Sequence, residues 1–253
     1  MSPTFPSQRP ASPSVNMIRL EQLKKKFGKR VAVEELSLQI PEGSLYGLLG
    51  HNGAGKSTTI GMMLGQVIPD SGRVLIAGQD VQENRAGALK HVGAIFETPS
   101  FYSYLTGRQN LEIFCNYAAS VTAAEIAEVT ALVRLESRID DPVRVYSHGM
   151  RQRLALAQAL LPRPRVLILD EPSEGLDPEG IYEMRELIRQ LHRDFQLTVL
   201  ICSHLLAEVE LICPEVAIMR KGKLLFSGNW RNEGEPGRTL EQFYLQTVKG
   251  IEV

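Results

Sequence analysis

Residues 50–58, Gly-His-Asn-Gly-Ala-Gly-Lys-Ser-Thr, have the types and spacing to bind a chain of phosphates, and we call them the P-loop. They fit the pattern G-x-x-x-x-G-K-S/T and follow an apolar run at 44–50 that has the length of a buried strand. Glycines let backbone N–H groups wrap the phosphates, Lys56 supplies a cation for the β- and γ-phosphates, and Ser57 offers Mg²⁺ a hydroxyl. A glycine-rich turn before an ordinary helix is the alternative, and the preceding strand argues against it. The residues assigned to the nucleotide are Asn52, Gly53, Ala54, Gly55, Lys56, Ser57 and Thr58.

Two acids, Asp170 and Glu171, stand at the end of an apolar run that begins at residue 165. An acid at the end of a buried strand, beside a phosphate loop, can hold Mg²⁺ directly or through water. A second carboxylate next to it can orient and polarise the attacking water. An acidic strand end with a turn at Pro172 is the alternative, and the presence of the P-loop makes it the weaker one.

His204 follows another apolar run, at 197–202. Taken alone, it is equally well explained as a helix-capping or core residue. The carboxyl ends of parallel strands meet at one edge of a sheet, and ligands bind at that edge. The P-loop, the acid pair and His204 all follow strand ends, so the sequence predicts that His204 contacts the γ-phosphate.

A second candidate phosphate site begins at Ser147. Residues 145–160, "VYSHGMRQRLALAQAL", have the composition of a helix that opens near a Ser and a Gly and continues with small apolar residues. Free N–H groups and the helix dipole make such a helix start attractive to anions. The sequence therefore predicts two phosphate sites in one chain.

The motifs and their order resemble the ATP-binding subunit of ABC transporters. After the P-loop come "YSHGMRQRL", "LILDEP", "SEGLD" and "CSH", and the resemblance covers about residues 18–245. Other P-loop proteins lack a second helix start immediately before the acid strand, so the combination is specific. The resemblance implies an α/β fold, in which a P-loop NTPase core carries an inserted α-helical subdomain and an N-terminal antiparallel β region.

Two ATPase domains of this family face each other head to tail, which explains the two phosphate sites. The resemblance implies that Ser147, His148 and Gly149 of one chain close on the γ-phosphate held by the P-loop of the other. It also implies that Asp177 lies in a loop that crosses the interface. We call residues 145–160 the signature segment and residues 171–177 the acid loop.

The resemblance assigns the remaining site residues as well. It makes Glu171 and His204 catalytic, and the implied Mg²⁺ ligands are Ser57, Glu97 and Asp170. Phe27 resembles the aromatic residue that stacks on adenine, and a core position on the strand after Lys26 is the alternative.

The same resemblance implies ATP and Mg²⁺ as cofactors. The implied partners are an integral membrane transporter subunit and a second ATPase subunit, either an identical chain or a close relative. The chain is then expected to hydrolyse ATP at the cytoplasmic face of the cell membrane, as a peripheral subunit that drives export.

Two places depart from the family pattern. The usual Leu-Ser-Gly-Gly-Gln is replaced by Tyr-Ser-His-Gly-Met at 146–150, where His148 is either a solvated interface residue or an extra donor near the γ-phosphate. Glu97 stands where the family usually has a Gln that touches Mg²⁺ and water. This Glu, together with "YGLLGHNGAGKST" and "SHGMRQRL", resembles the branch of exporters that handle bacitracin-like and lantibiotic peptides for self-protection.

Local composition along the chain predicts where its tails, its domain and its inserted subdomain lie. Residues 1–16 are rich in Pro and Ser and are expected to form a disordered tail. The ATPase domain is expected at 17–245, with the inserted helical subdomain and the signature motif at 97–150, and a C-terminal tail at 246–253.

Apolar patterning supplies the elements that must position the site. Strands are expected at 18–23, 36–40, 44–50, 73–78, 91–96, 165–170 and 197–202. Thr122 and Glu125 form a capping box for one helix, and Asp177 with Pro178 begins another. A short amphipathic segment is expected at 239–248.

Composition limits the class of protein. The chain has 253 residues, 43% of them hydrophobic, and its 28 Lys and Arg nearly balance 29 Asp and Glu, which argues against nucleic acid as a partner. Cys115, Cys202 and Cys213 show no metal-binding spacing and are expected to be reduced, buried thiols of a cytosolic protein. No signal peptide is visible and no apolar run approaches the ~18 residues that span a bilayer, so another chain is expected to cross the membrane.

Two other classes of function are alternatives to an exporter subunit. A soluble ABC protein acting on nucleic acid is the alternative, but chromosome-packing types need long coiled coils and translation types need two ATPase heads. This chain has no sustained heptads and a single P-loop. A GTPase or small-molecule kinase would leave the signature segment unexplained.

A group of aromatic residues adjoins Glu97. Its members are Phe96, Phe101, Tyr102 and Tyr104. They are explained equally well as the core of the helical insertion and as an apolar groove that receives a short helix from the membrane subunit.

Overall fold

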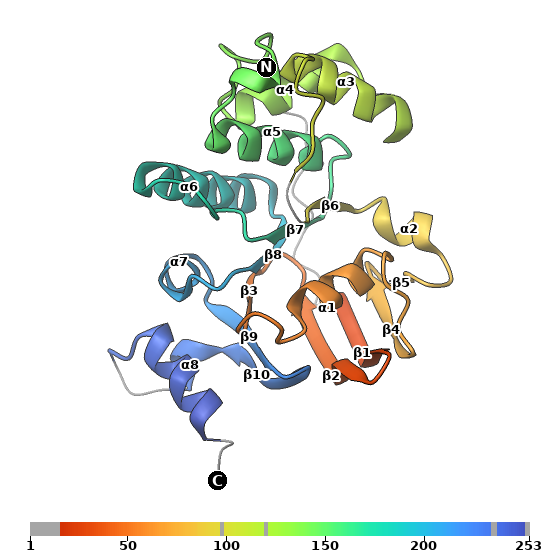
Figure 1. Ribbon diagram of the computed structural model, residues 1–253, viewed down its shortest axis with the longest axis vertical. Coiled ribbons are helices and arrows are strands. Elements are labelled where there is room, and N and C mark those ends of the chain that lie inside the picture. The colour runs from red at the N-terminus through yellow and green to blue at the C-terminus, as the bar shows by residue number, and fades with distance from the viewer. Residues whose placement is uncertain (1–15, 97–98, 119–120, 234–236, 251–253) are drawn as a thin grey trace.

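Six strands form the central sheet of the computed structural model, which describes residues 16–96, 99–118, 121–233 and 237–250. Their order is β10-β9-β3-β8-β7-β6, and neighbours are parallel except in the β9–β10 hairpin. The bounds are β3 (Leu45–Leu49), β6 (Val92–Ile95), β7 (Val166–Asp170), β8 (Thr198–Cys202), β9 (Glu215–Arg220) and β10 (Lys223–Asn229). This sheet lies between a helical layer and a second, smaller sheet (Figure 1).

Both faces of the central sheet are buried. Side chains alternate along each strand, so that Tyr46 and Leu48 face one core while Leu45 and Leu49 face the other. The nearly continuous apolar runs of β3, β7 and β8 are typical of parallel strands that are covered on both sides.

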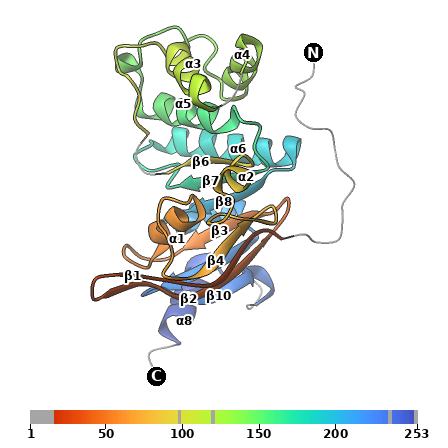
Figure 2. The same cartoon turned by 90° about the vertical axis from the view of Figure 1, so that its right-hand side faces the viewer.

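An antiparallel sheet covers one face (Figure 2). Its order is β2-β1-β4-β5, with bounds β1 (Asn16–Phe27), β2 (Arg30–Pro41), β4 (Ser71–Ile76) and β5 (Gln79–Asp80). Helix α1 (Lys56–Met63) contributes Ile60, Met62 and Met63 to the core shared by the two sheets. The short helix α2 (Arg85–Leu89) begins at Asn84, whose side chain accepts a hydrogen bond from the backbone of Gly87.

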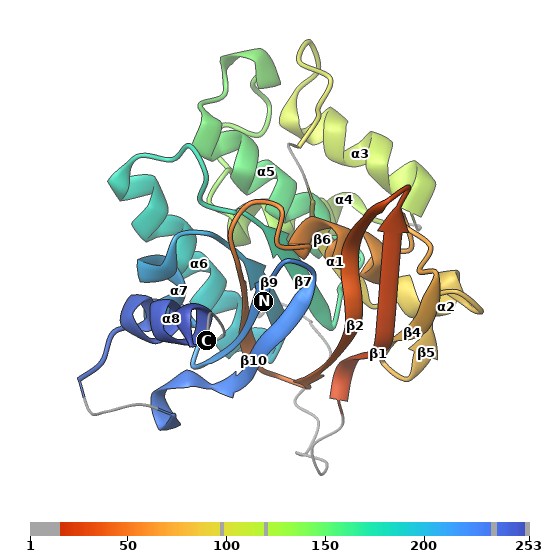
Figure 3. The same ribbon diagram turned by 60° about the horizontal axis from the view of Figure 1, so that its bottom comes forward.

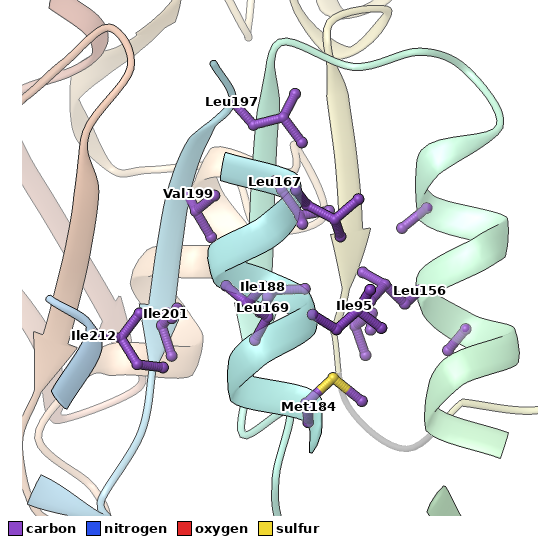
Figure 4. Close-up of a cluster of buried hydrophobic side chains, with 14 of the residues drawn as sticks. Ile95, Leu156, Leu167, Leu169, Met184, Ile188, Leu197, Val199, Ile201 and Ile212 are labelled. Atoms are coloured by element: carbon purple, nitrogen blue, oxygen red, sulfur yellow. The ribbon is translucent and has the colours of Figure 1, made fainter. Parts of the chain in front are cut away.

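Four helices cover the opposite face. They are α5 (His148–Leu160), α6 (Pro178–Phe195), α7 (Leu206–Ile212) and α8 (Leu240–Lys249), with a short 3-10 helix η2 (Trp230–Asn232) before α8. Leu156 on α5 and Met184 and Ile188 on α6 share one apolar cluster with Ile95 and Leu169 of the sheet (Figure 4). Helix α8 lies beside α7 on the side of the molecule away from β1 (Figure 3).

A helical region is inserted between β6 and β7 and stands at one end of the molecule (Figure 1). It holds α3 (Gly107–Ala118), α4 (Ala123–Leu132), a 3-10 turn η1 (Val143–Val145) and the start of α5. The predicted capping box is confirmed, because Glu125 accepts a hydrogen bond from Thr122 N at 2.8 Å and the Thr122 side chain accepts one from Glu125 N. Arg163 pairs with Glu125 at 3.3 Å and with Glu128 at 3.2 Å, which ties α4 to the end of α5.

The expected strands and helices are present, but several bounds differ. Asn16, expected in the tail, belongs to β1 because it pairs with Pro41 of β2. Helix α8 continues to Lys249, past the expected domain end at 245, since Val248 is buried and its carbonyl accepts a hydrogen bond from Arg220 at 2.7 Å. Residues 1–15 and 251–253 of the two expected tails lie outside the described residues.

The β9–β10 hairpin was not expected from the sequence, although a signal was present. Lys221 and Gly222 join the two strands with φ of 50° and 81°, the pair of left-handed residues that a tight hairpin turn needs. A Lys-Gly pair between two apolar runs was the signal, but it is weaker than the Asn-Gly or Asp-Gly pair usual in such turns.

The three cysteines are free and buried, as expected. Within the described ranges, no helix combines the length and apolar character needed to span a membrane.

We predict that Leu156→Ala lowers the free energy of unfolding by about 2–5 kcal/mol, because it leaves a cavity among side chains that are fully buried. Leu211→Ala is the matched control, since Leu211 is also helical but 49% exposed. Its effect should stay within about 0.5 kcal/mol. Urea unfolding followed by circular dichroism measures both, and equal losses would contradict the assignment of this core.

Candidate functional site

The P-loop is tightly wrapped because its glycines carry no side chain. Gly53 and Gly55 have φ of 79° and 108°, which residues with a Cβ rarely adopt. A Cβ on Gly55 would lie 2.5 Å from the carbonyl oxygen of Ala32 on β2. Helix α1 begins at the next residue, so its first N–H groups are free to face a bound anion.

Lys56 lies almost wholly inside this loop, with 7% of its surface exposed. Its Nζ donates a hydrogen bond to the carbonyl oxygen of Gly50 at 2.6 Å, which holds the ammonium against the first residue of the loop. Ser57 is exposed and Thr58 is half-buried, so both hydroxyls lie where a ligand can reach them.

Two segments that are distant in sequence contact the P-loop and support its shape. The sequence patterns did not indicate either contact. Gly222, in the β9–β10 turn, donates a hydrogen bond to the carbonyl oxygen of Ala54 and accepts one from Glu34 N, both at 2.8 Å. On α8, Tyr244 packs edge-on against His51 with 5.6 Å between ring centroids. The P-loop is therefore held from both the β9–β10 hairpin and α8.

Asp170, the last residue of β7, lies beside Cys202 of β8. Burial raises the pKa of Asp170 above its usual value, while a hydrogen bond from the Cys202 thiol and the charge of Lys56 act in the opposite direction. A carboxylate whose charged form is disfavoured by burial gains from a cation, and Lys56 is the protein cation that acts on it.

Glu171 occupies a strained position, with φ of 49°. A residue other than glycine in this left-handed region costs about 1–3 kcal/mol and persists where the surroundings fix it. Here Glu171 N donates to the carbonyl oxygen of Cys202 at 2.8 Å. The turn directs the Glu171 side chain away from the strand and toward the segment after β8.

The Glu171 carboxylate is held by three groups of that segment. His204 Nδ1 lies 2.9 Å from Oε1, and Ser203 Oγ and His204 N donate to Oε2 at 3.2 and 3.4 Å. His204 is partly exposed, so the core alternative for this residue is wrong. The structure thus brings the two predicted catalytic residues into contact, and it adds Ser203, which the sequence did not single out.

The signature segment begins α5 as predicted. Ser147 is exposed and its Oγ accepts a hydrogen bond from Met150 N at 3.2 Å. Tyr146, next to it, is buried and donates to the carbonyl oxygen of Arg138 at 2.7 Å, and burial raises its pKa to about 12. Tyr146 therefore anchors the segment in the helical region and leaves Ser147 on the surface.

His148 makes a contact that neither sequence interpretation included. The ring is exposed, and its Nε2 lies 2.8 Å from the carbonyl oxygen of Glu174 in the acid loop. Asp177 ends that loop and caps α6 by accepting a hydrogen bond from Gly180 N at 2.9 Å. The signature segment and the acid loop are thus joined within one chain.

Phe27 ends β1 and is 51% exposed, so its interpretation as a core residue is wrong. The Nζ of Lys25 lies 5.4 Å from the centre of its ring. Arg30, the strand partner of Phe27, brings Nη2 to 3.3 Å from the place where a Cβ on Gly53 would lie. Arg30 thus lies between Phe27, the predicted adenine-stacking residue, and the P-loop. Its sequence context did not indicate this position.

The predicted residues therefore form two groups. The first surrounds the P-loop, Asp170, Glu171 and His204, and the second contains Ser147, His148, Gly149 and Asp177. Across the part of the chain that the structure describes, no hydrogen bond or ion pair joins Ser147 or Asp177 to the P-loop. Glu97, the third predicted Mg²⁺ ligand, lies outside the described residues.

Similarity to known proteins agrees with this geometry. A family model described as "ABC transporter" matches residues 33–174. An uncharacterized ABC transporter ATP-binding protein of Bacillus subtilis (strain 168), YhcH, is 48% identical over 217 residues, which are 86% of this chain and 71% of the relative.

Two further relatives carry transport names. The bacitracin transport ATP-binding protein BcrA of Bacillus licheniformis is 43% identical over 209 residues, 83% of this chain and 68% of BcrA. The lantibiotic transport ATP-binding protein SrtF of Streptococcus pyogenes is 34% identical over 232 residues, 92% of this chain and 97% of SrtF.

Solved structures share the fold. The ATP-binding subunit of an ABC transporter superposes with a TM-score of 0.81 at 27% identity, over 92% of this chain and 99% of that one. A dimeric ATP-binding cassette, MJ0796, bound to ADP and Pi, has a TM-score of 0.74 at 22% identity, over 83% of this chain and 97% of that one. The second likeness bears on the fold alone.

We predict that Lys56→Ala abolishes tight ATP binding, because the phosphates lose the buried cation of the P-loop. Lys90→Ala, at an exposed lysine after α2, is the matched control and should bind ATP as the parent does. Titration with a fluorescent ATP analogue measures both. Parent-like affinity of the Lys56 variant would contradict the assignment of this site.

Proposed function

Because the chain belongs to the ABC transporter family and is an ATP-binding, ATP-hydrolysing subunit of that kind, we propose that it drives export of a peptide antibiotic or similar drug through a separate membrane-spanning subunit. The observation that carries the proposed site is the contact of Glu171 with His204 at the sheet edge that also holds the P-loop. The cargo is inferred from relatives named for bacitracin and lantibiotic transport. A role on nucleic acid is not favoured, since these relatives are transport proteins.

The P-loop is suited to the phosphates of ATP. Its glycines leave the backbone bare where a Cβ would collide with neighbouring strands, and the start of α1 offers free N–H groups. On binding, Lys56 would exchange its bond with the carbonyl oxygen of Gly50 for the β- and γ-phosphates. The exposed ring of Phe27 would stack on the adenine, and Arg30 lies between the two regions.

The residues around Asp170 fit Mg²⁺, which takes one or two protein oxygens and completes its shell with water and phosphate oxygens. Asp170 supplies a carboxylate and Ser57 an exposed hydroxyl. Burial disfavours the charged form of Asp170, and a divalent cation would reverse that effect. Bound there, the metal would neutralise charge on the transferred phosphoryl group. Glu97 is the further ligand that the resemblance adds.

Glu171 is placed to activate water. Its carboxylate is held by Ser203 and His204, which fixes its direction. It would accept the proton of the water that attacks the γ-phosphate, and His204 would hold the carboxylate in line. The strained backbone of Glu171 would be tolerated because it points the carboxylate toward the attacking water.

The second group of residues supports assembly in pairs. Ser147 is exposed and Gly149 half-exposed at the start of α5, and within the described residues no acidic side chain is hydrogen-bonded to this helix start. In a head-to-tail dimer this helix start would close on the γ-phosphate bound to the other chain. Asp177, which follows on the same surface loop as Glu174, would lie at the same interface.

The aromatic residues of the insertion suggest how the membrane subunit docks. Phe96 and Phe101 are partly buried, Phe96 against the core under the antiparallel sheet and Phe101 against the core under the helices, which favours a structural role for both. Tyr102 and Tyr104 are exposed, and their rings pack edge to face with 6.0 Å between the ring centroids. This exposed pair is the part of the group that is free to receive a short helix of the membrane subunit, at the cytoplasmic face.

We predict that Glu171→Gln binds MgATP but hydrolyses it at least about 100-fold more slowly, because an amide accepts a proton far less readily than a carboxylate. The variant should accumulate as an ATP-bound dimer on a sizing column. Glu174→Gln is the matched control on the same loop and should retain most of the ATPase rate. Near-normal turnover by the Glu171 variant would remove this residue from the catalytic role.

We predict that ATPase activity of the isolated chain rises more than linearly with its concentration, because each site needs two chains. Mixing Ser147→Arg protein with Lys56→Ala protein should restore part of the activity that each lacks alone, since one composite site in the mixed dimer keeps both halves intact. Activity strictly proportional to concentration, with no recovery on mixing, would contradict the head-to-tail arrangement.

A further inference from the structure

The ring of His148 faces its own chain. Its Nε2 lies 2.8 Å from the carbonyl oxygen of Glu174, and a carbonyl oxygen only accepts, so the proton sits on Nε2. That N–H is therefore directed at the acid loop and is not available to a phosphate. The bond connects the first residue of α5 to a loop that begins at Glu171 and ends at Asp177.

The acid loop is shaped to receive this ring. Gly175 has φ of 73°, and a Cβ there would lie 3.3 Å from His148 Nε2, so a side chain at this position would crowd the imidazole. Glu174 N donates to the carbonyl oxygen of Glu171 at 3.1 Å, which makes a tight turn out of the first part of the loop. The Glu174 carbonyl oxygen that accepts from His148 therefore lies one hydrogen-bonded turn of backbone from Glu171.

We propose that His148 is a positioning residue that fastens the start of α5 to the acid loop of its own chain and thereby holds Glu171 in its working direction. This role rests on the proposed function of Glu171 as the base. It differs from the two roles that the sequence left open, because His148 acts on its own chain and not on the nucleotide of the other.

In a dimer, the hydrogen bond between His148 and Glu174 would couple the two ATP sites. The start of α5 would face the nucleotide of the other chain, whereas Glu171 serves the nucleotide of its own chain. His148 joins these two structures through one hydrogen bond. Closure of α5 on one nucleotide would therefore move the acid loop that serves the second nucleotide.

The first test compares three proteins with the parent, namely His148→Ala, His148→Gln and His192→Ala. The Gln amide places an N–H as many bonds from Cβ as imidazole Nε2, so it can restore the bond to Glu174. His192 also contacts a backbone carbonyl, that of Leu197 at 2.9 Å, but lies on α6 away from the acid loop, and it controls for loss of a histidine–carbonyl bond.

We expect His148→Ala to lower kcat about tenfold with little change in KM, because the base is misdirected while ATP is still held. His148→Gln should recover most of kcat, and His192→Ala should keep the parent kcat. Thermal unfolding is measured in parallel. Equal kcat for the Ala and Gln variants, or a kcat loss matched by the His192 control, would overturn the proposal.

The second test uses mixed dimers in which one chain carries Glu171→Gln, so that a single site turns over. His148→Ala is then placed either on the chain with the intact Glu171 or on the other chain. We expect the larger loss of kcat when the variant shares a chain with the intact Glu171. An equal or larger loss from the other chain would show that His148 acts on the facing nucleotide, and would overturn the proposal.

The mixed dimer of one parent chain and one Glu171→Gln chain, without any change at His148, separates this inference from the proposed function. If this dimer showed no activity, the head-to-tail arrangement would be contradicted. The comparison of His148→Ala with His148→Gln in the unmixed protein would still decide the role of the histidine, because it needs no assigned partner site.

Discussion

Burial of the central sheet on both faces leaves one region for charge, the carboxyl edge of its strands. Asp170, at the end of β7, lies at this edge beside Cys202 of β8, and Lys56 follows β3 through the P-loop. Lys56 is buried, and its charge partly offsets the burial that raises the pKa of Asp170. Affinity for the charged phosphates of ATP therefore follows from the way the core leaves these groups at the sheet edge.

The shape of the P-loop at this sheet edge depends on backbone segments that approach it closely. The P-loop touches β2 through Gly55 and is hydrogen-bonded to Gly222 of the β9–β10 turn, so its shape is set by strands that are far away in sequence. Tyr244 adds a third support from α8 through His51. These contacts make the phosphate site a property of the whole domain, and the antiparallel sheet and the last helix are part of its construction.

Much of the site was predictable because it depends on local patterns. Glycine spacing, an apolar run that ends in Asp170 and Glu171, and the caps at Thr122 and Asp177 each follow from the chemistry of neighbouring residues. The bond between His148 and Glu174, the braces at Gly222 and Tyr244, and the place of Arg30 join segments that are distant in sequence, and composition carries no signal for such pairs. The β9–β10 hairpin was not predicted because Lys-Gly is a weak turn signal. The domain end was placed at 245, before the end of α8, because the last turn of α8 is held by the distant Arg220.

The three buried cysteines make this protein a convenient starting point for site-directed labelling. Burial raises the pKa of the Cys115 thiol, raises that of Cys213 to about 12, and raises that of Cys202, which also donates to Asp170. Maleimides react with thiolates, so all three native positions are slow to react. A cysteine introduced on the surface would carry a fluorophore or spin probe without removal of the native thiols, which keeps the packing around Asp170 intact while the distance between two labelled chains is followed through the ATP cycle.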